Sequence, residues 1–132
     1  MKNLLRLTSL VCVIVAFLAV AVFGQTATGF STTASTVGST VLTLQGSVPA
    51  GNTITYQIAG SGCGGCTAPT NGTISQFNTN NGTLIYTPTS GYVGSDSFTF
   101  TVTATPTGGG SPTVSSAATV TITVTNAKTT IS

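Results

Sequence analysis

The sequence predicts an all-β fold of two packed antiparallel sheets. After the first two dozen residues, short runs alternate between apolar and hydroxyl-bearing side chains. Such alternation is typical of strands that bury one face and leave the other in water. β-Branched residues dominate these runs, and no segment in this part of the chain shows the i, i+3, i+4 apolar spacing of an amphipathic helix. Helix is therefore expected only at the N-terminus.

Residues 1–24 have the pattern of a signal-peptide helix. Lys2 and Arg6 supply a positive start, an apolar run over 7–23 follows, and Gly24 offers a small residue for cleavage. A retained membrane anchor stays open, because the run is near the lower length limit for spanning a bilayer. We expect a secreted or cell-surface protein that touches the membrane only through the segment if it is left uncleaved.

Residues 25–40 are rich in Thr and Ser and lack apolar periodicity. They predict either a flexible lead or a loose first strand, because such a stretch gains little burial against its ordering entropy. The organised domain is expected over residues 41–125, a length that can bury one workable core. Residues 126–132 are expected to form a polar tail.

Within the domain, strands are expected in runs of alternating or β-branched residues. Those at 72–77 and 83–87 should form a hairpin, since the Asn81-Gly82 pair between them favours the positive φ of a tight turn. The expected strands are 41–45, 53–59, 72–77, 83–87, 96–103 and 115–125. Their inward positions, the expected core, are Leu42, Leu44, Ile54, Tyr56, Ile58, Ile74, Leu84, Tyr86, Phe98, Phe100, Val102, Val120, Ile122 and Val124. Six or seven short strands of this kind indicate an immunoglobulin-like antiparallel β-sandwich.

The string GTLIYTPTSGYVGSDSFTFTV, residues 82–102, adds a family resemblance. With NGTISQF before it and ATVTITV at 118–124, it resembles the repeat units of bacterial cadherin-like and bacterial immunoglobulin-like domains of large surface adhesins. The resemblance covers residues 41–125. It implies a cadherin-like β-sandwich, an extracellular location and a role in adhesion, spacing or matrix building. Within the string, we expect Asp96 to cap the turn before the strand that holds Phe98 and Phe100.

Calcium binding is not carried over from this resemblance. Calcium-binding members have acidic residues in the loop after the first strand, whereas residues 46–52 contain no carboxylate. Calcium takes six to eight oxygen ligands, commonly with several carboxylates, and Asp96 is the only carboxylate side chain of the chain. We expect no metal ion and no cofactor.

Cys63 and Cys66 are expected to form a disulfide in an exported protein, although pairing between chains stays open. A redox role is not favoured, because no basic residue or helix start lies nearby to lower a thiol pKa. Two thiolates also make only half of a zinc site, and the chain has no histidine.

The titratable inventory argues against an enzyme. The chain has no histidine and one carboxylate side chain, and Lys128 is the only basic residue after residue 24. Acid–base catalysis needs a positioned titratable pair, and nucleic-acid binding needs clustered basic residues. The expected net charge of the exported form is near zero, which leaves little electrostatic barrier to self-association.

The expected function is therefore a non-enzymatic secreted or cell-surface structural or adhesive module, with a protein or surface glycan as its partner. One alternative is a self-assembling fibre or matrix subunit, a homo-oligomer or filament in which residues 25–38 add to the sheet of a neighbour. A carbohydrate-binding accessory domain is less favoured, because Tyr56, Tyr86 and Tyr92 are expected in the core and the chain has no Trp. The sequence does not name the partner.

Overall fold

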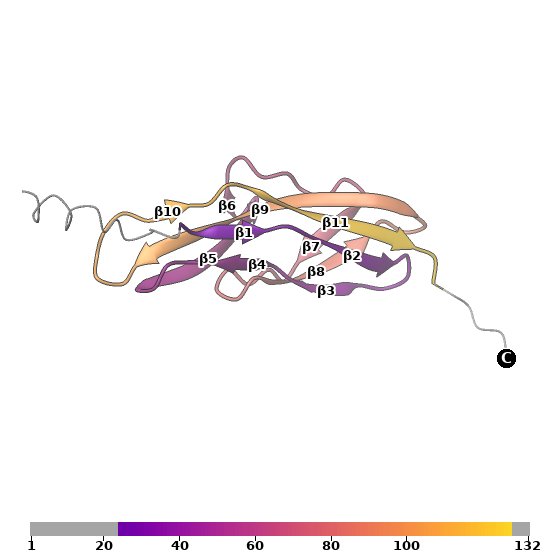
Figure 1. Cartoon of the computed structure of the whole chain (residues 1–132). Coiled ribbons are helices and arrows are strands. Elements are labelled where there is room, and N and C mark those ends of the chain that lie inside the picture. The colour runs from indigo at the N-terminus through magenta and orange to yellow at the C-terminus, as the bar shows by residue number, and fades with distance from the viewer. Residues whose placement is uncertain (1–23, 128–132) are drawn as a thin grey trace, which may run out of the picture.

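The computed structural model describes residues 24–127 as an elongated sandwich of β-sheets, with no helix in that part of the chain (Figure 1). The described chain enters toward the end that carries β10 and leaves beyond β11 at the opposite end (Figure 1). The predicted signal peptide, except for Gly24, and the end of the predicted tail from residue 128 lie outside the described residues.

The larger sheet has the strand order β2-β11-β9-β5-β6, and β10 pairs with β9. Its strands are β2 (Phe30–Ser35), β5 (Asn52–Ala59), β6 (Gly62–Cys63), β9 (Gly94–Pro106), β10 (Thr113–Val114) and β11 (Ala118–Thr125). The long β9 lies at the centre, paired with β11 along one part of its length and with β5 along the other.

The opposing layer consists of a three-stranded sheet with the order β3-β8-β7 and a two-stranded pair of β1 with β4. Its strands are β1 (Thr26–Thr28), β3 (Thr40–Thr43), β4 (Gln45–Ser47), β7 (Gly72–Ser75) and β8 (Thr83–Pro88). β7 and β8 form the predicted antiparallel hairpin. The predicted strand 41–45 is divided between β3 and β4, and Leu44 lies buried between them.

Together the layers make an immunoglobulin-like β-sandwich. In each long strand the side chains alternate between the two faces, so that every second residue points into the core. The burial patterns of β8 and β11 show this alternation. The most enclosed side chains come from both layers and include Tyr86, Phe98 and Phe100. Of the fourteen predicted core residues, Ile54 and Ile74 are only half-buried and pack against the cluster that the other twelve help to form.

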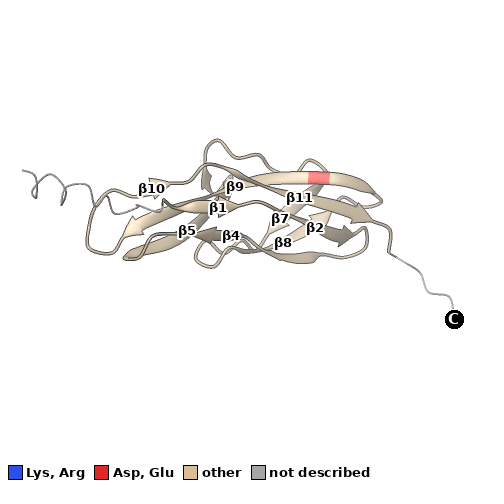
Figure 2. Cartoon of the chain, in the orientation of Figure 1, with Lys and Arg blue, Asp and Glu red and all other residues tan. Residues whose placement is uncertain are grey.

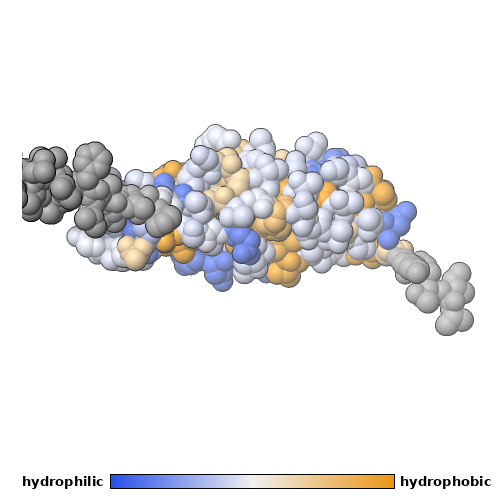
Figure 3. Space-filling model, viewed as in Figure 1, coloured by the Kyte–Doolittle hydropathy of each residue, from blue (hydrophilic) through white to orange (hydrophobic). Residues whose placement is uncertain are grey.

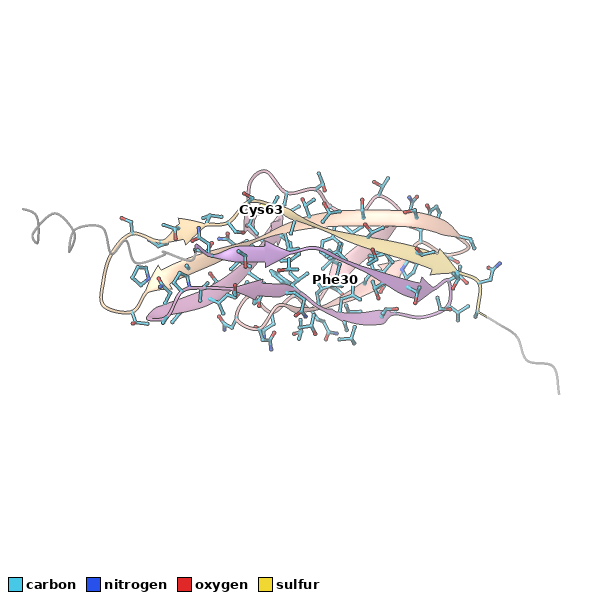
Figure 4. The ribbon with its side chains drawn as sticks, in the orientation of Figure 1. Phe30 and Cys63 are labelled. Atoms are coloured by element: carbon cyan, nitrogen blue, oxygen red, sulfur yellow. A yellow bond between two sulfur atoms is a disulfide. The ribbon has the colours of Figure 1, made fainter. Side chains whose placement is uncertain are left out.

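Residues 25–40 contain β1 and β2. Of the two alternatives that the sequence offers for this stretch, a flexible lead or a loose first strand, the structure has strands. Ala34 is buried in the core, and Phe30 packs against it near the middle of the molecule, where Figure 4 labels it. The apolar contrast of β2 is weak because its inward positions are Phe30, Thr32 and Ala34. The sandwich therefore begins at Thr26, well before residue 41.

The predicted antiparallel sandwich is confirmed as the class of fold, and two strand pairs within it are parallel. β2 runs parallel to β11, and β6 runs parallel to β5. The first follows from a change of sheet: β1 pairs with β4 in one layer, and the chain then continues in the same direction into the other layer beside β11. Gly29 makes this crossing, since a Cβ there would lie 2.6 Å from the Thr119 carbonyl oxygen.

Gly29→Ala is therefore expected to lower the free energy of unfolding by about 1–3 kcal/mol, because the methyl group would push β2 away from β11. Urea unfolding followed by circular dichroism measures the effect. Gly108→Ala is the matched control, since a Cβ there meets no atom within 4 Å. Equal stabilities of the two variants would contradict the close crossing.

Candidate functional site

The single carboxylate side chain of the protein lies inside the sandwich. Asp96 is on the inward side of β9, opposite Ile122 of β11, and is only 5% exposed. Figure 2 shows it as the one acidic residue of the described chain, with no basic residue there. A buried carboxylate without a cation is stable only if hydrogen bonds replace its hydration.

Four donors surround this carboxylate. Oδ1 accepts from the backbone N–H groups of Thr70 at 3.0 Å and Ser97 at 2.9 Å. Oδ2 accepts from the Asn71 N–H at 3.0 Å and from the Tyr86 hydroxyl at 2.7 Å. Tyr86 belongs to β8 in the opposing sheet, so this one carboxylate joins both sheets and the loop that precedes β7.

The observed role of Asp96 differs from the expected one. The sequence predicts a cap on the turn before β9, whereas the structure places Asp96 within β9, and two of its donors, Thr70 and Asn71, lie far away in the sequence. Sequence reasoning missed Tyr86 as its partner, because a buried tyrosine on an alternating strand reads as packing alone. The signal available was that the only acidic residue stands at an inward position of its strand.

Gly72 allows the Tyr86 ring to reach the carboxylate. A Cβ at Gly72 would overlap the ring and hydroxyl of Tyr86, so β7 can lie over the ring only without a side chain there. Gly72 begins β7 and does not have a positive φ, whereas Gly82 has a φ of 73° in the turn before β8. The two Asn-Gly pairs of the sequence thus serve different purposes: close packing at Gly72 and turn formation at Gly82.

The electrostatics follow from this enclosure. Burial raises the pKa of Tyr86, and the hydrogen bond to the charged Asp96 raises it further. Burial alone would also raise the pKa of Asp96, but the Tyr86 hydroxyl and the backbone N–H groups outweigh it and hold that pKa below its ordinary value. Asp96 is therefore an ionised acceptor enclosed by donors, which suits a structural clamp and not proton transfer to a substrate.

The loop after β5 is closed by the disulfide between Cys63 and Cys66, whose Cα atoms are 5.4 Å apart. Cys63 ends β6 and is labelled in Figure 4. A shallow hollow beside it is lined in part by Gln57 and Thr101. Gln57 Oε1 already accepts from the hydroxyls of Thr101 at 3.2 Å and Thr103 at 2.8 Å, so these polar groups satisfy one another.

The outer face of the larger sheet is a surface of hydroxyl groups. We call it the hydroxyl face and define it by the outward side chains of β2, β11, β9 and β5 that are not buried, which are Ser31, Thr33, Ser35, Thr119, Thr121, Thr123, Thr125, Ser95, Ser97, Thr99, Thr105, Thr53, Thr55 and Gln57. Cross-strand pairing puts them in register, for example Ser31 beside Thr121 and Thr121 beside Ser97. None is charged or aromatic. Thr101 and Thr103 also stand at outward positions of β9, but they are buried. Much of the molecular surface in Figure 3 is correspondingly pale, between hydrophilic and hydrophobic.

The described residues offer few other groups that could bind a metal ion, a sugar or an apolar ligand. Residues 24–127 contain no group of three or more His, Cys, Asp and Glu that could hold a metal ion. Tyr56 and Tyr86 are buried and Tyr92 is half-buried, so none of the tyrosines presents an open ring to a sugar. The exposed large apolar side chains of this part are the single valines Val37, Val41, Val93 and Val114. No helix in it could span a membrane.

Comparison with known proteins agrees with this architecture. Residues 19–125 match the family model for the bacterial Ig domain. The chain belongs to the bacterial Ig domain family. No curated protein matches it. Domains of this family are typically structural modules without catalysis, and they are usually displayed outside the cell.

Replacing Asp96 by Asn should lower the free energy of unfolding by about 3 kcal/mol, because the amide NH2 would face backbone donors that now have an acceptor. Tyr86→Phe should cost about 1–2 kcal/mol, since it removes one donor and leaves three. Chemical denaturation of both variants measures the difference. A larger loss for Tyr86→Phe than for Asp96→Asn would contradict the clamp.

Stability should also depend on pH through this one carboxylate. Because the pKa of Asp96 is lowered in the folded state, its contribution is present at neutral pH and is lost as the pH falls below about 4, its ordinary pKa. The loss should not exceed about 1.4 kcal/mol per pH unit, the value for one proton. Asp96→Asn should flatten the profile. An equally steep acid transition in that variant would contradict the assignment.

Removing the disulfide should have a small effect. The double variant Cys63→Ser, Cys66→Ser should keep the β circular dichroism spectrum and lose about 2 kcal/mol or less, because a loop this short constrains few unfolded conformations. The wild-type protein in reductant should match it. Loss of the fold in either sample would show that the bond supports more than its own loop.

Proposed function

We propose that this protein is a non-catalytic structural or adhesive module that acts outside the cell. The observation that carries the proposal is that the only carboxylate side chain is enclosed by hydrogen bonds inside a bacterial Ig domain, which leaves a surface of hydroxyl groups. Function therefore resides in the shape of the sandwich and in its surface. The positive start and apolar run at the N-terminus of the sequence and the disulfide agree with export.

The course of the chain supports a role in spacing. The described chain enters toward one end of the elongated sandwich and leaves at the other (Figure 1). A pulling force applied to the two ends would thus run along the long axis. The pairs of β2 with β11 and of β11 with β9 lie along this path and would resist the force by hydrogen bonds.

The hydroxyl face supports a second part of the proposal, an adhesive contact with a protein or a surface glycan. Hydroxyl groups donate and accept hydrogen bonds, and Thr methyl groups add apolar contact. A contact made in this way has almost no Coulomb component, since the described residues carry no exposed charged side chain. Its strength should respond little to ionic strength.

The test combines location with binding. Cells producing the whole chain should release or display a protein whose first residue is near Gln25, as determined by intact mass. That protein, immobilised on a surface, should retain cells or extracellular matrix material, and retention should change less than about twofold between low salt and 1 M salt. Protein kept inside the cell with Met1 retained would overturn the proposed location. Strongly salt-sensitive retention would overturn the uncharged contact.

A further inference from the structure

The strand order leaves β2 at an edge of the larger sheet. β2 pairs with β11 on one side over its whole length from Phe30 to Ser35. On its other side, no backbone hydrogen bond joins it to another strand within residues 24–127. An edge strand of this kind presents N–H and C=O groups that another chain can pair with.

The ladder identifies which groups face outward. The Thr36 N–H donates to the Thr125 carbonyl oxygen at 2.9 Å, so the backbone N–H of residue 36 points toward β11. Because successive residues of a strand direct their backbone groups to opposite sides, Thr32 and Ala34 are also directed toward β11. The N–H and C=O groups of Ser31, Thr33 and Ser35 therefore point to the open side.

The features that usually protect an edge are missing from β2. Its sequence, FSTTAS, contains no charged residue and no proline, and it pairs with β11 without a bulge. The other strands that end a sheet are shorter: β6 has two residues, β1 and β4 have three each, and β3 and β7 have four each. β6 covers only Ile58 and Ala59 of β5, but on the uncovered side the Tyr56 N–H already donates to the Thr79 carbonyl oxygen at 2.7 Å. After β7 the backbone turns away at Gln76, which has a φ of 50°. β2 is thus the longest strand that ends a sheet in the described sandwich.

We propose that two copies of this protein associate edge to edge through β2, in antiparallel orientation about a two-fold axis at Thr33. Thr33 then lies opposite Thr33 of the second copy, and Ser31 lies opposite Ser35. All of these residues direct their N–H and C=O groups to the open side, so each opposed pair exchanges two backbone hydrogen bonds. Identical strands that meet about a two-fold axis form a closed dimer.

The described surface favours a second copy as the occupant. Asp96 is the only charged side chain of residues 24–127 and it is buried, so like charges do not oppose the approach of an identical sandwich. The pairing also leaves every strand in its own domain. Exchange of residues 25–38 between copies would first have to break the pairing of β1 with β4 and of β2 with β11. The dimer joins two hydroxyl faces into one, which goes beyond the proposed function and does not depend on it.

Charge substitution at the two-fold axis tests the proposal. Thr33 is exposed, so Thr33→Lys and Thr33→Glu should fold normally. Each variant alone would place two like charges on opposed residues, with Cβ atoms about 5 Å apart. Each should weaken dimerisation at least about tenfold in sedimentation equilibrium on the whole chain as purified after any processing. An equimolar mixture of the two variants should recover dimers of mixed composition.

Backbone and surface controls make the test specific to the edge. Thr33→Pro removes the N–H that faces the open side and spares the ladder to β11, and it should also weaken dimerisation at least about tenfold. Thr33→Val keeps that N–H and should dimerise like the wild type. Thr53→Lys adds the same charge to the hydroxyl face on β5, away from the edge, and should have no effect.

Three results would overturn the proposal. The first is a wild-type protein that stays monomeric up to millimolar concentration. The second is an assembly that Thr33→Lys, Thr33→Glu and Thr33→Pro leave unchanged, because it would then use another surface. The third is a mixture of the Lys and Glu variants that dimerises no better than either variant alone. Circular dichroism of each variant establishes that the comparison is between folded proteins.

Discussion

The hydrogen bond between the Tyr86 hydroxyl and the Asp96 carboxylate connects the parts of this sandwich that the sequence leaves separate. It joins β8 to β9 across the two layers, and the same carboxylate holds the Thr70 and Asn71 N–H groups of the loop before β7. A buried ionised group without a cation needs such donors to offset lost hydration. The packing around it follows, including the missing side chain at Gly72 that makes room for the tyrosine ring.

With its one carboxylate enclosed, the described domain presents a surface without exposed charge. Most soluble domains use Lys and Glu on their outward strand positions, both for solubility and to block edge pairing. Here Ser and Thr occupy those positions on the larger sheet. They keep the strand alternation and the polarity, but they provide no repulsion between copies. The same composition therefore favours both an uncharged adhesive surface and association of the chain with itself.

The candidate site could be predicted from the sequence only in part. The bonded cysteines and the buried apolar positions follow from local rules, namely cysteine spacing and period-two alternation. The partners of Asp96 do not, because Thr70, Asn71 and Tyr86 meet it only when two layers and a loop are assembled. The sequence does not decide between a flexible lead and a strand over residues 25–40 for another reason. The inward positions of β2 include Thr32 and Ala34, which give little hydrophobic contrast.

The sequence by itself determined the class of fold, the immunoglobulin-like sandwich and most of its core, because side-chain alternation is a local property that burial must respect. Only the tertiary structure decided the parallel placement of β2 beside β11, since Gly29 lets the chain cross between layers through an approach to the backbone of Thr119. It also decided which strand is left at the edge, because that depends on the order of strands in the sheet. Strand order arises from contacts between distant segments, and no local pattern of side chains encodes it.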